Sequence, residues 1–118
     1  PKFSRVRHVC VGGSPSRMQL FAEELAAALP GTPWVPVGDT KRYSLFLVGS
    51  HTLVASHGMG CPSISILLHE VANLLRAGDV ALSKTQWVRM GTCGGIGSEA
   101  GSLVLSTKAV DAALRPYQ

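Results

Sequence analysis

The sequence predicts an α/β fold in which a mixed β-sheet is flanked by helices. Two observations carry this prediction. Short β-branched and apolar runs alternate with two stretches in which apolar residues recur at helical spacing. Three of the strand-like runs lead into glycine-rich loops, and open α/β sheets bind ligands at such strand ends. No repeat or low-complexity linker divides the chain, so we treat residues 1–118 as part of one domain.

The first strand and helix are predicted near the amino terminus. Residues 5–11 form a β-branched run that ends in two glycines, which predicts a buried strand and a tight loop. Residues 18–29 place apolar side chains at helical spacing. Pro15 lies just before this helix, Ser14 or Ser16 can cap it, and a Pro-Gly pair ends it.

The remaining elements follow a loop rich in proline and glycine that extends to residue 38. Residues 43–48 and 51–56 predict two strands joined as a hairpin by a Gly-Ser turn. Residues 63–76 predict an amphipathic helix, because their apolar residues fall on one face. Two last strands are predicted at residues 85–90 and 102–107, with a glycine loop between them.

Composition excludes several classes of protein. Hydrophobic residues make up 46% of the 118 residues and charged residues 15%, which is typical of a globular protein and not of a disordered one. The net charge of +4 comes from scattered Lys and Arg, so no nucleic-acid-binding patch is indicated. No apolar run is long enough to span a bilayer, so we expect no membrane association. The chain starts with proline, and we expect it to be a fragment.

The cysteines indicate neither a zinc site nor a disulfide framework. Cys10, Cys61 and Cys93 are odd in number and have no CxxC spacing. A reducing, cytoplasmic setting is the simplest interpretation.

The loop at residues 12–17 has the outline of an anion site. It joins a strand to a helix, its Gly13 lets the backbone N–H approach an oxyanion, and Arg17 adds a planar cationic group. A structural turn with a solvated arginine explains this loop equally well. The loop is neither GxGxxG nor a Walker loop, so dinucleotide and ATP binding have no support.

A second cluster lies at residues 89–95. Arg89 stands near the end of a strand expected to be buried, where a bound anion would compensate its charge. Thr92 offers a hydroxyl beside it. An ion pair with Glu70 or Asp79 explains Arg89 equally well.

The third cluster, at residues 56–66, combines small residues at a strand end with a Pro-Ser pair that opens a helix. His57 suggests catalysis, but a loop histidine hydrogen-bonded to the backbone is the simpler interpretation. Met59 fits a sugar pocket or core packing equally well.

These three clusters, in this order, resemble the nucleoside phosphorylase family that includes uridine phosphorylases and hexameric-type purine nucleoside phosphorylases. Residues 56–70 fit the family signature throughout, and Val71 stands where the signature has leucine. The details are most similar to animal uridine phosphorylases. Those read Cys-Val-Gly-Gly-Ser-Pro-Ser-Arg-Met in the first loop, as at residues 10–18, and Ser-His-Gly-Met-Gly in the second, as at residues 56–60. The third loop, at residues 89–97, departs only at Met90 and Cys93.

The resemblance implies a nucleoside phosphorylase-like fold, of which residues 1–118 would be the N-terminal part. It assigns the phosphate ligands as the Gly13 N–H, Arg17, Arg89 and the Thr92 hydroxyl. Arg42 matches an arginine that reaches across a dimer interface into the neighbour's phosphate site. Arg89 would also be catalytic, since it would hold the phosphate in line with the anomeric carbon of the ribose.

The resemblance further implies the reaction, the partners and the cofactors. The reaction would be reversible phosphorolysis of uridine to uracil and ribose 1-phosphate, in a homodimer whose active sites are shared across the interface. Cys93 and Gly94 match positions that touch the nucleoside. No cofactor is expected, since phosphate is a substrate, and no metal site is expected, because Tyr43 replaces a glutamate that helps bind a cation in bacterial relatives.

Two alternatives remain open at this point. The chain could be a non-catalytic binding or dimerisation module with the same fold. It could also belong to a purine-type nucleoside phosphorylase, because the residues that recognise the base in the family match no part of this sequence.

Overall fold

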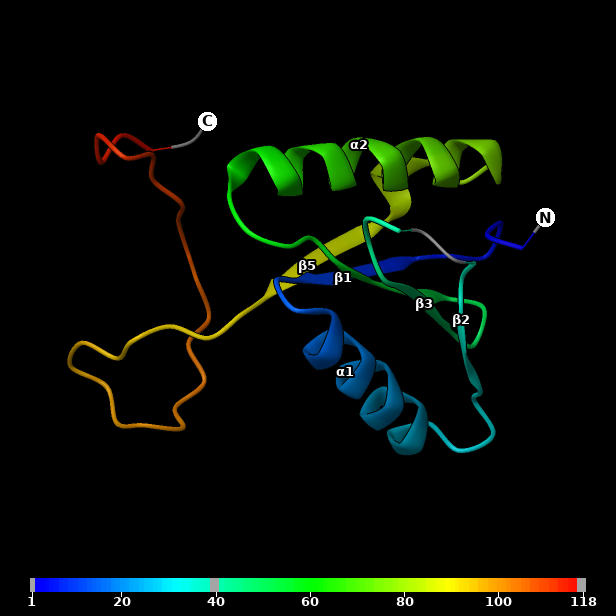
Figure 1. Ribbon diagram of the computed structural model, residues 1–118, viewed down its shortest axis with the longest axis horizontal. Coiled ribbons are helices and arrows are strands. Elements are labelled where there is room, and N and C mark those ends of the chain that lie inside the picture. The colour runs from blue at the N-terminus through cyan, green and yellow to red at the C-terminus, as the bar shows by residue number, and fades with distance from the viewer. Residues whose placement is uncertain (1, 39–40, 117–118) are drawn as a thin grey trace.

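In the computed structural model, which describes residues 2–38 and 41–116, a five-stranded sheet lies between two helices (Figure 1). This confirms the predicted α/β fold with a mixed sheet flanked by helices. The strand order in the sheet is β2-β3-β4-β1-β5. The elements, in chain order, are β1 (His8–Gly12), α1 (Pro15–Ala28), β2 (Trp34–Pro36), β3 (Leu45–Val48), β4 (Thr52–Ser56), α2 (Cys61–Ala77), a 3-10 turn (Leu82–Lys84) and β5 (Gln86–Met90).

The two helices bury separate apolar clusters on opposite faces of the sheet. On one face α2 contributes Leu67, Val71 and Leu75, which pack with Val9 and Val11 of β1. On the other face α1 contributes Met18 and Ala22, which pack with Cys10, Phe46 and Val54. Alternate residues of β1 therefore point to different helices, as the period of a strand requires. Because both faces are covered, the residues of β1 after His8 are all buried and do not alternate with exposed ones.

The register of the central strands aligns the points at which three loops start. β1 pairs in parallel with β4 on one side and with β5 on the other. Gly12, the last residue of β1, lies opposite Ser56 of β4 and Met90 of β5. The three glycine-rich loops predicted at strand ends therefore start at the same edge of the sheet.

The prediction is wrong for two segments, because strand formation there depends on a neighbouring strand and not on the strand propensity of the residues. Residues 34–36 fall in the segment predicted as a loop, but they pair antiparallel with β3 as the edge strand β2. A proline is tolerated there because an edge strand needs only one set of ladder bonds. Residues 102–107, predicted as a strand, form no ladder in the described part of the chain, because no strand lies beside them.

The segment after β5 leaves the body of the protein (Figure 1). It exposes large apolar side chains: Leu103 is 97% exposed and Ile96 is 99% exposed. Met59, in the loop before α2, is also exposed, so it does not pack in the core. No helix among the described residues is both long and apolar enough to cross a membrane.

The three cysteines form no disulfide, and Trp34 makes an aromatic contact. Cys10, Cys61 and Cys93 are all free thiols. Burial raises the pKa of the Cys10 thiol, which disfavours its reactive thiolate form. Trp34 packs edge-on against Phe46, with ring centroids 5.6 Å apart, and therefore serves packing.

The tight packing at the end of β1 gives a first prediction. A Cβ on Gly12 would stand 2.3 Å from Met18 Sδ and 3.2 Å from the Met90 backbone oxygen. Met18 is itself buried. We expect Gly12→Ala to lower the free energy of unfolding by about 1–3 kcal/mol, because overpacking displaces either α1 or β5. Urea denaturation followed by circular dichroism measures the change.

Gly94→Ala is the matched control, since a Cβ there meets nothing within 4 Å. It should leave the urea midpoint unchanged. Equal midpoints for the two variants would show that the end of β1 relaxes without cost.

Candidate functional site

Three loops meet at the carboxyl ends of β1, β4 and β5, and backbone hydrogen bonds join two of them. The His57 N–H donates to the Gly12 carbonyl at 2.8 Å, and the Gly58 N–H donates to the Gly13 carbonyl at 3.1 Å. These bonds extend the β1–β4 ladder beyond the last paired residues. The loop after β4 is therefore fixed against the loop after β1.

A cavity of about 190 Å³ opens between the loop after β1, the start of α1 and the loop after β5. Across this cavity Arg17 Nη1 donates a hydrogen bond of 3.0 Å to Thr92 Oγ1, which joins residues far apart in the chain. Gly13, Arg17 and Thr92, three of the residues that the resemblance assigns to phosphate, thus lie around one space. Its lining consists of Gly12, Gly13, Arg17, Met18, Phe21, Met90, Gly91 and Thr92.

Because Gly13 has no side chain, a space remains beside the loop that follows β1. An atom at the position of its absent Cβ would be 3.9 Å from Arg17 Nη2, 3.9 Å from His57 Cε1 and 3.5 Å from the Gly58 carbonyl oxygen. The guanidinium of Arg17 and the imidazole of His57 therefore border the same small volume.

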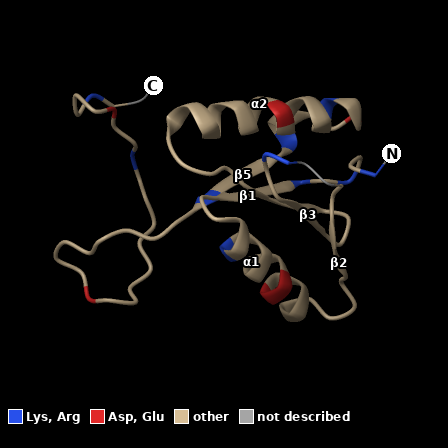
Figure 2. Ribbon diagram, in the orientation of Figure 1, with Lys and Arg blue, Asp and Glu red and all other residues tan. Residues whose placement is uncertain are grey.

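The amino terminus of α1 adds positive potential to this site. Ser14 occupies the N-cap position with extended backbone, but its side chain makes no capping hydrogen bond. Its hydroxyl instead pairs with the Ser16 hydroxyl at 2.9 Å, so the predicted capping by either serine does not occur. The first turn has no acidic residue, and Figure 2 shows basic segments at the start of α1 and at the end of β5. The partial positive charge of the helix end is thus available to an anion.

Arg89 lies near this cavity without lining it. It pairs in register with Val11, whose side chain faces α2, so Arg89 starts from the opposite face of the sheet to Arg17. Its guanidinium bends back toward the strand end, since a Cβ on Gly91 would be 3.5 Å from Arg89 Nη1. There it borders an adjoining cavity of about 550 Å³, which shares Met90, Gly91 and Thr92 with the first.

The premise that Arg89 is buried is wrong. β5 is an edge strand with a single neighbour, and Arg89 is exposed to solvent. Water can therefore solvate its charge, and burial alone does not require a counter-ion. No ion pair or side-chain hydrogen bond of Arg89 is present within residues 2–38 and 41–116, so neither Glu70 nor Asp79 is its partner. The guanidinium is left available to a ligand.

His57 is buried, although it lies in the loop that follows β4. It is 5% exposed, and neither Nδ1 nor Nε2 has a hydrogen-bond partner among the described residues. The simpler interpretation, a ring hydrogen-bonded to backbone, is therefore met only in part: backbone groups at Gly58 and at His57 itself lie near the ring, but neither nitrogen forms a hydrogen bond of good geometry with them. Burial and, after it, the charge of Arg89 lower the pKa of His57 below its ordinary value of 6.5, while the backbone at Gly58 and at His57 itself opposes this shift.

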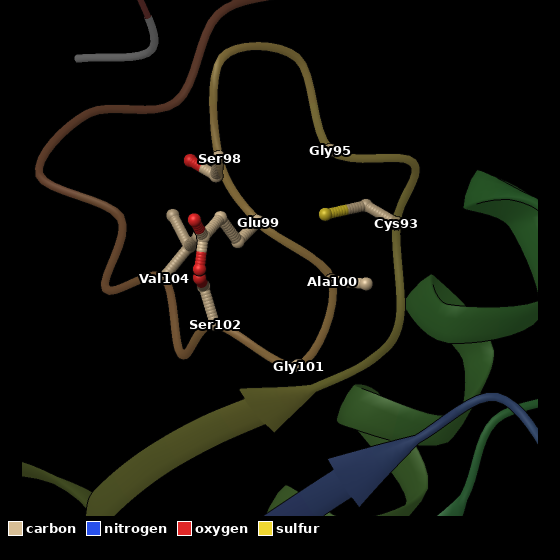
Figure 3. Close-up of a pocket in the computed structure, with 8 residues that line it drawn as sticks. All are labelled: Cys93, Gly95, Ser98, Glu99, Ala100, Gly101, Ser102 and Val104. Carbon is tan, nitrogen blue, oxygen red and sulfur yellow. The ribbon is translucent and has the colours of Figure 1, made fainter.

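The other predicted site residues lie outside the first cavity. Arg42 precedes β3 on the far side of β4, with its guanidinium 5.5 Å from the Tyr43 ring centroid. Cys93 points into a space of about 340 Å³ enclosed by the loop at residues 93–104 (Figure 3). Gly94 has no atom of the described chain within 4 Å of its Cβ position. The structure therefore does not unite Cys93 and Gly94 with the Arg17 cavity.

Groups of three or more His, Cys, Asp or Glu side chains that could hold a metal ion do not occur in the described ranges. The sequence expectation of no metal site stays a prediction.

The lowered pKa of His57 gives a pH dependence of stability. The folded state holds the ring neutral to a lower pH than the unfolded state, which takes up its proton near pH 6.5. Between these two pKa values the unfolded state binds more protons, so the free energy of unfolding falls as the pH falls. The stabilisation is complete above pH 6.5 and is lost as the pH drops through the folded pKa. We expect the thermal midpoint to fall between about pH 7.5 and about pH 5.5.

The variant His57→Phe keeps a ring of similar size and cannot titrate. Its midpoint should fall less over the same pH range, whereas His69→Gln, which replaces an exposed histidine on α2, should follow the parent protein. Identical pH profiles for His57→Phe and the parent would remove His57 as the cause.

Comparison with known proteins identifies the family. Residues 7–118 match the phosphorylase superfamily. The chain is 42% identical to mouse uridine phosphorylase 1, over 97% of this chain and 37% of that protein. It is 40% identical to inactive uridine phosphorylase B of Schistosoma mansoni, over 98% of this chain and 39% of that protein. The crystal structure of uridine phosphorylase from Schistosoma mansoni in complex with uracil superimposes with a TM-score of 0.87 at 41% identity, covering 99% of this chain and 40% of that one. The chain therefore spans about two fifths of the length of these relatives, and it belongs to the phosphorylase superfamily.

Proposed function

We propose that this chain is the phosphate-binding part of a uridine phosphorylase, which converts uridine and phosphate reversibly to uracil and ribose 1-phosphate. The observation that carries the proposal is the cavity around which Gly13, Arg17 and Thr92 meet, with Arg17 and Thr92 joined across it. The chain is 42% identical to mouse uridine phosphorylase 1 and 41% identical to uridine phosphorylase from Schistosoma mansoni along nearly its whole length, and this supports uridine as the substrate.

The proposed role of the site is to hold phosphate and place it for attack. The Gly13 N–H, the first turn of α1 and the Arg17 guanidinium bind its oxygens. The Thr92 hydroxyl, which accepts from Arg17 at 3.0 Å, can donate its own proton to the anion. No covalent intermediate is needed, because phosphate itself attacks the anomeric carbon as uracil leaves.

Arg89 is the proposed catalytic residue. It approaches the strand end from the α2 face while Arg17 approaches from the α1 face, so the two guanidiniums would hold phosphate from two sides. Their charges bind the phosphate and fix its orientation in line with the anomeric carbon of the ribose. Cys93 and Gly94 would contact the nucleoside on the side of the larger cavity, which Cys93 borders.

The remaining roles need more than one chain. We propose a homodimer in the cytoplasm in which Arg42 completes the phosphate site of the neighbour. Arg42 is exposed, and it lies near the same sheet edge as Gly12, because Ser44, two residues further on, accepts a hydrogen bond from the Ser56 N–H at the end of β4. An exposed cation at this edge is available to a second protomer.

A non-catalytic protein of the same family is the competing proposal. The observation behind it is the 40% identity to an inactive uridine phosphorylase, which is nearly the same as the 42% identity to mouse uridine phosphorylase 1. Overall identity therefore does not separate the two proposals, and catalysis has to be measured.

The phosphate site is tested by anion binding. We expect Arg17→Gln to weaken the binding of inorganic phosphate to the 118-residue chain by about tenfold or more, since a charge-assisted contact is lost. Arg89→Gln should weaken it to a similar extent. Phosphate-31 NMR titration or calorimetry measures the affinity.

Arg76→Gln is the matched control, with the same charge change at the far end of α2. It should retain the parent affinity. Unchanged binding by Arg17→Gln would dismiss the phosphate site, whatever the control shows.

Catalysis is tested in a chimera of mouse uridine phosphorylase 1 in which residues 7–118 replace the matching segment. We expect the chimera to release uracil from uridine in a phosphate-dependent manner. Arg89→Gln in this background should lower turnover by about 100-fold or more, because the phosphate is no longer held in line with the anomeric carbon. The 118-residue chain alone should release none, since it spans only 37% of that relative. A chimera that folds and binds phosphate but has no turnover would favour the non-catalytic alternative.

A further inference from the structure

We propose that His57 is a further phosphate-contacting residue, whose ring N–H donates a hydrogen bond to an oxygen of the anion held between Gly13 and Arg17. The inference rests on the phosphate site proposed above. It adds a neutral donor to the groups that this chain itself supplies, which are otherwise two guanidiniums, a hydroxyl and backbone N–H groups.

The first support is the unsatisfied imidazole. His57 is 5% exposed, and both of its ring nitrogens lack a hydrogen-bond partner among residues 2–38 and 41–116. Buried polar atoms nearly always have a partner, and leaving one unpaired is costly. A ligand that accepts a hydrogen bond from the His57 ring would remove this cost.

The second support is the direction in which the ring points. His57 Cε1 is 3.9 Å from the vacant Cβ position of Gly13, and Arg17 Nη2 is also 3.9 Å from that position. Because Cε1 is covalently bonded to both ring nitrogens, the edge of the ring that faces Gly13 is the edge that carries them. The Arg17 guanidinium and the His57 imidazole therefore border the same small volume beside Gly13, together with the Gly58 carbonyl oxygen at 3.5 Å.

The third support is the rigidity of the loop that carries the ring. The His57 N–H donates to the Gly12 carbonyl at 2.8 Å, and the His57 carbonyl accepts from the Ser63 hydroxyl in the first turn of α2. The residue is thus attached both to β1 and to α2. A donor held this way loses little conformational entropy when it binds.

Charge explains why a histidine is suited to this place. Arg17 and Arg89 already bring two permanent cations to the strand ends, and a third would repel them when no anion is bound. The burial of His57 and the nearby Arg89 keep the pKa of the ring below its ordinary value. At neutral pH the ring is therefore uncharged, and it offers one donor without adding to the repulsion.

The test is a titration of the 118-residue chain with inorganic phosphate, followed by long-range proton–nitrogen NMR correlations of the histidine rings. We expect the His57 ring nitrogens to shift with the same saturation curve as phosphate binding. The signals of His69 should stay in place, because that ring is exposed on α2 and its Nδ1 is already bonded to the Ser65 carbonyl.

Two variants separate hydrogen bonding from packing. His57→Phe keeps a ring but removes the donor, and we expect it to weaken phosphate binding by about tenfold. His57→Gln restores a side-chain N–H and should recover part of the affinity. His69→Gln is the control and should bind as the parent does.

Each outcome decides between the two proposals. If phosphate binds in an Arg17-dependent way while the His57 ring signals and the His57→Phe affinity do not change, the role of His57 is wrong and the phosphate site stands. If the parent chain binds no phosphate, both proposals are wrong. Should His57→Phe fail to fold, the ring titration of the parent chain still decides.

Discussion

The parallel pairing of β1 with both of its neighbours is the constraint on which the rest of the structure depends. A parallel ladder fixes which residues end together, and here it sets Gly12 opposite both Ser56 and Met90. The loop to α1, the loop to α2 and the loop after β5 consequently leave the sheet at one edge. A slip of two residues in the β1–β5 ladder would keep the faces correct but would separate Arg17 from Thr92.

Two adjacent glycines serve different purposes at this edge. At Gly12 there is no room for a side chain, because Met18 and the backbone of Met90 already occupy the space. At Gly13 there is room, and the groups around it are a guanidinium, an imidazole and a carbonyl oxygen. The first glycine allows α1 and β5 to pack closely on β1, and the second leaves a volume for something other than protein. Folding and binding thus place separate demands on neighbouring positions.

Much of the fold and part of the candidate site could be predicted from the sequence, because both follow from local patterns. The helical spacing of apolar residues gave α1 and α2, and the hairpin and three glycine loops were marked by turn residues. What failed depended on neighbours in space. Residues 34–36 form a strand because β3 lies beside them, whereas residues 102–107 have no neighbouring strand among the described residues. Arg89 is exposed because its strand lies at the edge of the sheet. No local sequence pattern predicts that the His57 ring lacks a hydrogen-bond partner, because this depends on how the surrounding elements pack around it.

The exposure of the site determines how strongly its parts can act. Arg17, Arg89 and Thr92 are all open to solvent in this chain, and charges at about 4 Å attract by only about 1 kcal/mol in water. A surface that covered the carboxyl edge of the sheet would exclude water and strengthen each of these contacts severalfold. The exposed apolar side chains of the segment after β5, such as Leu103 and Ile96, are suited to lie against such a surface. His57 differs from the arginines because it is already buried, so its hydrogen bond to an anion would act at low local dielectric even before the edge is covered.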